Sequence, residues 1–147
     1  MTDKQKVAEE KFLEGFNCAQ AVFSAFKDEL ELTEEEVLKI SCGFGAGMGR
    51  MQNTCGAVTG AFMVIGGLKG KYKQGDDAAK EGTYKLVQEF ADDFIAINDT
   101  ISCYELLDCD FSTEKGKEKF KENNMLEEKC LQYVGDAVKL LEENVLS

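Results

Sequence analysis

Residues 54–68 read TCGAVTGAFMVIGGL and form the longest nearly uncharged apolar run of this 147-residue chain. Thr54 is a residue of the helix-capping type, so we expect a helix from Cys55 to about Leu68. The run is too short to span a bilayer. Glycine and alanine recur along it every three to four residues, which lets a second helix or a cofactor approach its backbone closely.

Further helices are predicted on both sides of this run from apolar periodicity and capping residues. They cover 2–16, 18–30 and 33–40 before the run, and 76–97 and 126–146 after it. The stretch 112–124 is dense in lysine and glutamate, and we expect a solvated helix or a loop there. Thr33 with Glu36 and Ser102 with Glu105 have the spacing of capping boxes. Nothing has the alternation of a strand. We therefore expect a single all-α domain over 1–147, a bundle of about five to six helices with a glycine-rich loop over 41–50.

Six cysteines and no histidine direct the chemistry of this chain toward sulfur. The net charge of −11 argues against nucleic acid and anionic membranes as partners and suits a basic redox partner protein. A homodimer through the small-residue helix or the last helix remains open. The charged stretch 1–12 lacks the apolar segment of a signal peptide, so we expect a cytoplasmic protein whose cysteines are reduced.

Four cysteines directly follow a residue that often caps helices. The pairs are Asn17-Cys18, Ser41-Cys42, Thr54-Cys55 and Ser102-Cys103. A cysteine in the first turn of a helix lies among unpaired N–H groups, which stabilise the reactive thiolate. Cys55 is the strongest candidate, because Gly56 and Ala57 leave their amide hydrogens uncovered as donors to a thiolate, a sulfide or an anionic ligand. The alternative is a small core residue at a tight helix crossing.

The predicted loop reads SCGFGAGMGR over 41–50, and its last residue is the only arginine of the chain. The loop fits neither the dinucleotide-binding nor the P-loop pattern, so we do not expect a nucleotide site. Arginine offers a rigid fork of donors for carboxylate or phosphate. Arg50 would therefore hold an anion or help to shield a cluster, unless the loop is only a flexible connector.

Several motifs together resemble the C-GCAxxG-C-C family, small domains named for four cysteines. They are NCAQAV at 17–22, GFGAGMGR at 43–50, CGAVTGA at 55–61, CYELL at 103–107, and Cys130 followed by Tyr133-Val134. The resemblance runs from Phe16 to about Leu141 and makes Cys18, Cys55, Cys103 and Cys130 the family cysteines. It implies redox activity through cysteine, and an iron–sulfur centre. Where the family label reads Gly-Cys-Ala, this chain has Cys-Gly-Ala at 55–57.

Three hypotheses follow for function. In the first, Cys18, Cys55, Cys103 and Cys130 hold an iron–sulfur cluster for electron transfer or redox sensing, with zinc as the alternative metal. In the second, a metal-free thiol–disulfide oxidoreductase uses Cys55 as the low-pKa nucleophile, and Cys18 or Cys103 resolves the mixed disulfide. The third is a helical interaction protein whose cysteines only pack. The spacing of the cysteines matches no ferredoxin, zinc-ribbon or CxxC signature, and Cys42 and Cys109 lie outside the set.

Overall fold

The computed structural model describes residues 1–146, which fold into helices joined by turns and one isolated antiparallel bridge. The α-helices are α1 (Asp3–Leu13), α2 (Cys18–Ser24), α3 (Lys27–Leu30), α4 (Glu34–Ser41), α5 (Gly45–Met48), α6 (Gly56–Lys69), α7 (Asp77–Asn98), α8 (Cys103–Leu107), α9 (Glu114–Glu122) and α10 (Leu131–Leu141). A 3₁₀ turn spans Cys42–Phe44, and π-helical turns span Leu126–Cys130 and Glu142–Leu146. The all-α prediction is confirmed.

The expected count of five to six helices is wrong, because two predicted helices are interrupted. Phe26 leaves helical geometry (φ −110°, ψ 16°) while its side chain is completely buried, and this divides the segment 18–30 into α2 and α3. The last predicted helix begins and ends in π-helical turns around α10. Short elements also form within 41–50, where we expected one loop.

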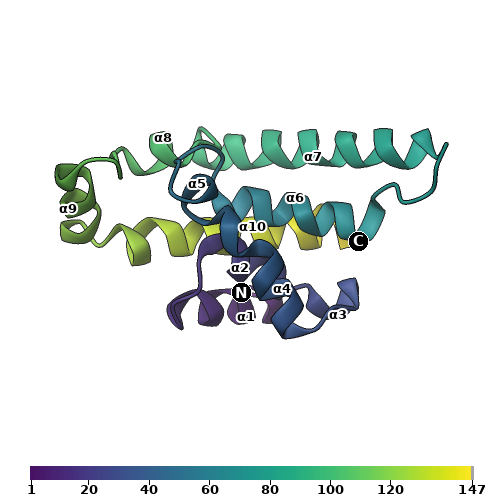
Figure 1. Cartoon of the computed structure of the whole chain (residues 1–147), viewed down its shortest axis with the longest axis horizontal. Coiled ribbons are helices and arrows are strands. Elements are labelled where there is room, and N and C mark those ends of the chain that lie inside the picture. The colour runs from purple at the N-terminus through teal and green to yellow at the C-terminus, as the bar shows by residue number, and fades with distance from the viewer. Residues whose placement is uncertain (147) are drawn as a thin grey trace.

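The helices form a bundle around α6 and α10. In Figure 1, α7 lies along one side, α6 and α10 run beside it through the middle, and α1 to α4 cover the opposite side. The largest completely buried side chains include Phe26, Ile65, Phe94 and Leu141, which come from all three of these regions. Burial of such side chains contributes about 1.5–3 kcal/mol each.

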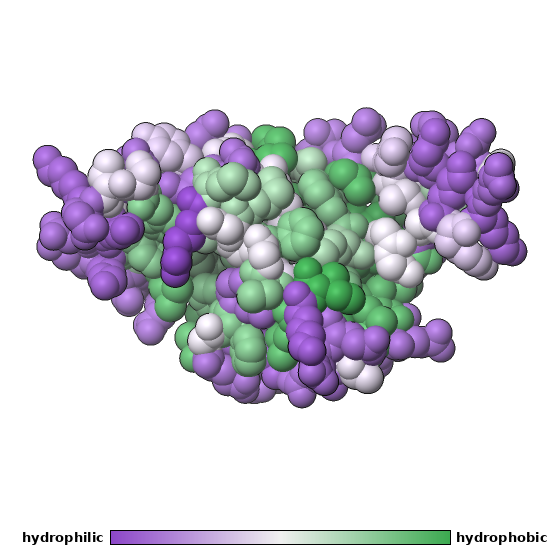
Figure 2. All heavy atoms as spheres, viewed as in Figure 1, coloured by the Kyte–Doolittle hydropathy of each residue, from purple (hydrophilic) through white to green (hydrophobic). Residues whose placement is uncertain are grey.

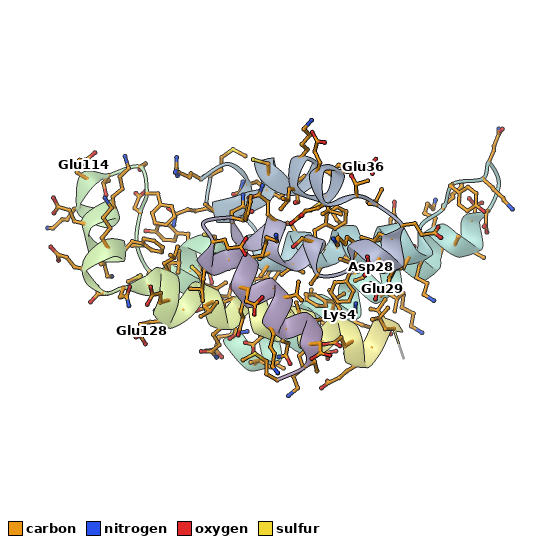
Figure 3. All side chains as sticks on the ribbon, turned by 90° about the horizontal axis from the view of Figure 1, so that it is seen from below. Lys4, Asp28, Glu29, Glu36, Glu114 and Glu128 are labelled. Atoms are coloured by element: carbon orange, nitrogen blue, oxygen red, sulfur yellow. The ribbon has the colours of Figure 1, made fainter. Side chains whose placement is uncertain are left out.

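An ion pair at the edge of the bundle links two of the outer helices. Lys4 of α1 and Glu29 of α3 form this pair, and the two side chains lie close together in Figure 3. The pKa of Glu29 is lowered by the hydrogen bond from Lys4, against the effect of partial burial. None of the helices within residues 1–146 has both the length and the apolarity needed to cross a membrane.

Helices α2 and α6 pack closely because α6 carries glycine where they meet. A Cβ added to Gly60 would lie 2.9 Å from the carbonyl oxygen of Ala19 and 3.2 Å from Cβ of Val22. These distances leave no room for a side chain without a shift of the helices. The small-residue run of α6 therefore permits a tight helix crossing, and this crossing positions the site described next.

Candidate functional site

One cavity of about 710 Å³ is lined by residues of α1, α2 and α9 and of the segments near them. Its lining includes Cys18, Cys55, Cys103 and Cys130, which come from four different parts of the chain. Aromatic and aliphatic side chains supply much of the remaining wall: Phe12, Phe16, Leu106, Phe111, Phe120 and Tyr133. The fold thus brings four thiols that are distant in sequence to a single hollow.

Cys18 is the first residue of α2, and Asn17 caps that helix as predicted. The Gln20 N–H donates to Oδ1 of Asn17 at 2.9 Å, and the Gln20 side chain accepts from the Asn17 N–H at 3.0 Å. Nδ2 of Asn17 donates to the carbonyl of Cys42 at 2.8 Å. Asn17 therefore fixes both the start of α2 and the position of the glycine-rich segment beside it.

Cys18 lies directly over the start of α6. A Cβ added to Gly56 would lie 2.3 Å from Sγ of Cys18. Only glycine fits at position 56 while that sulfur stays in place. This contact gives the order Cys-Gly-Ala at 55–57 a physical reason, since the order Gly-Cys-Ala would place a side chain against Cys18.

Cys55 and Cys103 are held near each other by a short antiparallel pairing of the segments that precede α6 and α8. Thr54 pairs with Ser102 in an isolated bridge. The Cys55 N–H donates to the carbonyl of Ile101, and the Cys103 N–H donates to the carbonyl of Asn53, each at 2.7 Å. Cys55 is consequently the N-cap residue of α6 rather than a residue of its first turn, and Thr54 does not cap.

Among the four thiols of the cavity, Cys18 is the one whose pKa is lowered from its ordinary value. Its pKa falls to about 7, mainly because the Cys55 thiol donates a hydrogen bond to its sulfur. Burial opposes this effect, and backbone N–H groups of Ala46, Ala19 and Cys18 itself add to the stabilisation of the thiolate. A thiol with this pKa is about half ionised at pH 7 and largely ionised at slightly alkaline pH.

The other three thiols of the cavity keep their protons. Donation to Cys18 and burial raise the pKa of Cys55 well above its ordinary value, although the Ala57 N–H acts in the opposite direction. Burial and the neighbouring charge of Cys18 raise the pKa of Cys103 and of Cys130 to about 12. We expected Cys55 to be the low-pKa thiol, and these pKa directions instead favour Cys18 as the thiol that ionises first.

The glycine-rich segment bends back toward Cys18 through residues with unusual backbone geometry. Ala46, Met48, Arg50 and Gln52 all have positive φ, a conformation that disfavours side chains by on the order of 1 kcal/mol or more each. A Cβ on Gly45 would lie 2.3 Å from the Asn17 side chain, so this glycine permits close packing. The result of the bend is that the Ala46 N–H reaches the Cys18 sulfur.

Cys130 ends the π-helical turn Leu126–Cys130, where the Leu131 N–H donates to the carbonyl of Leu126. One turn later, the Tyr133 hydroxyl donates to the carbonyl of Leu106 at 3.4 Å. Burial, and then the negative charges of neighbouring groups, raise the pKa of Tyr133 to about 12. π-Helical turns are frequent at functional sites.

The remaining candidate residues are distributed as follows. Gly56 and Arg50 line the cavity, whereas Ala57 belongs to the hydrophobic core and offers only its N–H. Cys42 is exposed, with no capping bond from Ser41. Cys109 is buried beside Cys103 in a small apolar cluster and does not line the cavity.

The sequence predictions did not include the aromatic wall or Gln52. Nε2 of Gln52 donates to the carbonyl of Cys109 at 2.8 Å, and its Oε1 accepts from the Phe111 N–H at 2.8 Å. This buried amide holds the turn that follows α8 and thereby one side of the cavity. A polar residue with positive φ leaves no recognisable signal in a single sequence, so reasoning from residue type could not find it.

The donor set of the cavity suits iron–sulfur clusters and zinc, which both bind cysteine thiolates. The geometry is less suitable. Within residues 1–146, no three cysteine, aspartate or glutamate side chains are grouped closely enough to hold one metal ion. Binding by all four sulfurs would therefore require these side chains to move toward one another.

Comparison with known proteins gives a match to a family model. A family model described as "Putative redox-active protein (C_GCAxxG_C_C)" matches residues 16–144. This range is nearly the whole chain and includes all four cysteines of the cavity. No match was found among curated proteins or among solved structures.

Proposed function

This chain belongs to the C_GCAxxG_C_C family, whose description assigns it a redox role, and we propose that it is a metal-free dithiol–disulfide redox protein. Cys18 is the nucleophile and Cys55 is the resolving thiol. The observation that carries the proposal is that Cys18 and Cys55 lie together at the wall of an open cavity, where the pKa of Cys18 is lowered to about 7 mainly by its interaction with the Cys55 thiol.

The reaction begins with the Cys18 thiolate. It attacks one sulfur of a substrate disulfide, the sulfur–sulfur bond of the substrate breaks, and the first substrate thiolate leaves and takes up a proton from solvent. Cys18 is then joined to the other half of the substrate in a mixed disulfide. The charge that held the Cys55 proton is thereby removed from Cys18.

The second step uses Cys55, which already faces Cys18. The Cys55 sulfur attacks the Cys18 sulfur while the Cys55 proton passes to the departing substrate thiolate. The bond between Cys18 and the substrate breaks, the second substrate thiol is released, and a Cys18–Cys55 disulfide remains. Two electrons pass from the dithiol to the substrate, which becomes two thiols. An external thiol reductant restores the dithiol by the reverse exchange.

The surrounding groups favour Cys18 as the nucleophile and Cys55 as the resolving thiol. The N–H groups of Ala46 and Ala19 stabilise negative charge on Cys18, the sulfur that must carry it. Cys103 and Cys130 remain protonated at neutral pH and are poor nucleophiles. The proposal therefore assigns the exchange to one pair among four neighbouring thiols.

Disulfide mapping by mass spectrometry tests the assignment. Reduced protein treated with 2-hydroxyethyl disulfide should form a Cys18–Cys55 disulfide, and the Cys55→Ser variant should accumulate the mixed disulfide on Cys18. The Cys18→Ser variant should form neither. Cys42→Ser serves as the matched control, because it removes an exposed cysteine outside the cavity and should leave the mapping unchanged. Modification of Cys55 ahead of Cys18 would refute the assignment.

A second candidate, an iron–sulfur or zinc protein, is favoured by the presence of all four family cysteines in one cavity. Cys18, Cys55, Cys103 and Cys130 would hold the metal, which would supply electron transfer if it were an iron–sulfur cluster. Cys130→Ser separates the candidates, since dithiol exchange does not use Cys130. Protein purified without oxygen from iron-replete cells should be colourless and contain neither iron nor zinc. Stoichiometric metal that disappears in Cys130→Ser would favour the second candidate.

A further inference from the structure

We propose that the substrate of the Cys18–Cys55 pair is a small organic disulfide with an apolar, preferably aromatic, body and an acidic group that is bound by Arg50. This inference rests on the proposed function for the reacting bond. The binding of the body and of the acidic group rests on the cavity alone.

The size of the cavity and the burial of its sulfurs favour a small molecule. A volume of about 710 Å³ is within the range of pockets that bind small organic ligands, about 300–1,000 Å³. Cys55 is only 6% exposed, and Cys18 is partly buried against Gly56. The disulfide of a folded protein partner would have to enter this recess to reach Cys18, whereas a small disulfide can be enclosed by it.

The walls favour an apolar body. Phe12 and Phe16 line the cavity on the α1 side, and Phe111 and Phe120 line it on the α9 side. The rings of Phe111 and Phe120 pack edge to face with centroids 5.2 Å apart, which fixes their position. Figure 2 shows hydrophobic side chains exposed between the mostly hydrophilic α9 end and the centre of the molecule. Such rings offer faces and edges for stacking with an aromatic ligand.

The charged groups of the lining favour an anion. Arg50, Lys117 and Lys121 offset Glu114, Glu118 and the Cys18 thiolate, so the lining carries no net negative charge in a chain whose net charge is −11. Lys117 forms an ion pair with Glu114, which lies at the start of α9 in Figure 3.

Arg50 remains available among these groups. It is exposed and forms no ion pair or hydrogen bond with any other residue in the part of the chain that the structure describes. Its backbone is held at φ 67°, so the strained segment after Gly49 fixes where this side chain leaves the backbone. A planar guanidinium without a protein partner, at the wall of an apolar cavity, is suited to binding a carboxylate in two parallel hydrogen bonds.

Two aromatic disulfides that differ in charge test the proposal. 5,5′-Dithiobis(2-nitrobenzoic acid) carries two carboxylates, and 4,4′-dithiodipyridine is uncharged at pH 8. Arg50→Gln should slow the reaction of Cys18 with the first reagent about tenfold, the typical effect of losing one charged hydrogen-bonding pair, and should leave the second unchanged. The control Lys85→Gln removes a positive charge on α7, outside the cavity, and should slow neither.

The outcomes separate the two proposals. If neither reagent modifies Cys18, the proposed function fails. If both modify Cys18 and Arg50→Gln changes the two rates equally or not at all, the proposed function survives and this inference is overturned. Equilibrium binding of 8-anilinonaphthalene-1-sulfonate gives a readout that needs no reaction. Wild-type protein should bind one molecule per chain, about tenfold more tightly than Arg50→Gln, and equal binding by the two proteins would also overturn the inference.

Discussion

Cys18 and Cys103 have the same local sequence pattern, but their thiol pKa values are shifted in opposite directions. Each is the first residue of a helix, and in each case the preceding residue accepts a capping hydrogen bond, at 2.9 Å for Asn17 and 3.3 Å for Ser102. Yet the pKa of Cys18 is lowered to about 7, and that of Cys103 is raised to about 12. A position at a helix start therefore does not by itself make a thiolate.

The difference lies in what surrounds each sulfur. Cys18 accepts hydrogen bonds from the Cys55 thiol and from backbone N–H groups, including that of Ala46 from a distant segment. Cys103 has one side-chain donor, Gln52, and burial outweighs it. The partial positive charge at a helix N-terminus lowers the pKa of a thiol only modestly. Several hydrogen-bond donors to one buried sulfur can lower its pKa by more than one unit. Tertiary contacts thus decide which of the two cysteines has the lowered pKa.

The largest effect is expected from filling the space that Cys18 occupies. Gly56→Ala places a Cβ where Sγ of Cys18 now lies, so the side chain or the helix must move. We expect the unfolding free energy to fall by about 1–3 kcal/mol and the pKa of Cys18 to rise toward its ordinary value. Urea unfolding and the pH dependence of alkylation measure the two effects.

Gly66→Ala is the matched control for this prediction, because nothing lies within 4 Å of a Cβ at this position of the same helix. It should stabilise the protein by up to about 1 kcal/mol through helix propensity. Equal effects of the two substitutions would mean that Gly56 does not make room for Cys18.

The next effect isolates the hydrogen bond between the two thiols. Cys55→Ala removes the donor and should raise the pKa of Cys18 by at least about one unit, equivalent to about 1.4 kcal/mol. Cys55→Ser keeps a hydroxyl donor and should hold the pKa closer to 7. If alanine and serine gave the same pKa, donation from residue 55 would not be the cause, and the contrast with Cys103 would need another explanation.

The pH dependence of stability offers a smaller test. The pKa of Cys18 is lower in the folded protein than its ordinary value of 9.0, so its contribution to stability is present above pH 9 and is lost as the pH falls through 7. Unfolding free energy should therefore rise from pH 7 to 9 by on the order of 1 kcal/mol.

Cys103 and Cys130 contribute with the opposite sign, because their pKa values are raised. Their contribution is present below pH 9 and is lost as the pH rises toward 12. Denaturation of wild-type protein under reducing conditions should show a maximum near pH 9. Cys18→Ala should abolish the rise below pH 9 and keep the decline above it. A rise that persists in this variant would assign it to another group.

The smallest effect is expected from relieving backbone strain in the segment that places the Ala46 N–H near the Cys18 sulfur. Ala46→Gly keeps the N–H and relieves a residue held at φ 54°. We expect a gain in stability of about 0.5–1 kcal/mol with the alkylation pKa of Cys18 unchanged. Thermal denaturation checks the first expectation. A loss of stability would show that the methyl group of Ala46, which lines the cavity, contributes more than its backbone strain costs.

Much of the helical architecture could be predicted from local sequence. Thr33 and Glu36 form the expected capping box, and α6 follows the predicted boundaries closely. The break at Phe26 was not predictable, because a buried aromatic side chain overrides an unbroken helical pattern. Which apolar residues of α1 are buried depends on the helices packed against it: Ala8 and Phe12 are buried, whereas Val7 is 45% exposed.

The site was only partly predictable, and for a physical reason. The family resemblance identified Cys18, Cys55, Cys103 and Cys130 as a set, but their spacing could not show that they line one cavity. Their roles depend on contacts between segments distant in sequence: Thr54 with Ser102, Gly56 with Cys18, and Ala46 with Cys18. Such contacts set the pKa values, and sequence patterns do not encode them.

The most direct test is the rate at which iodoacetamide alkylates each cysteine of reduced wild-type protein. Peptide mass spectrometry measures this rate for each cysteine as a function of pH. Cys18 should react first, with a midpoint near pH 7, and Cys55, whose pKa is raised, should react after it. Cys103 and Cys130, with pKa values of about 12, should remain protected below about pH 10. Preferential reaction of Cys55 or Cys103 at neutral pH, or a midpoint for Cys18 near 9, would contradict the assignment of the thiolate to Cys18.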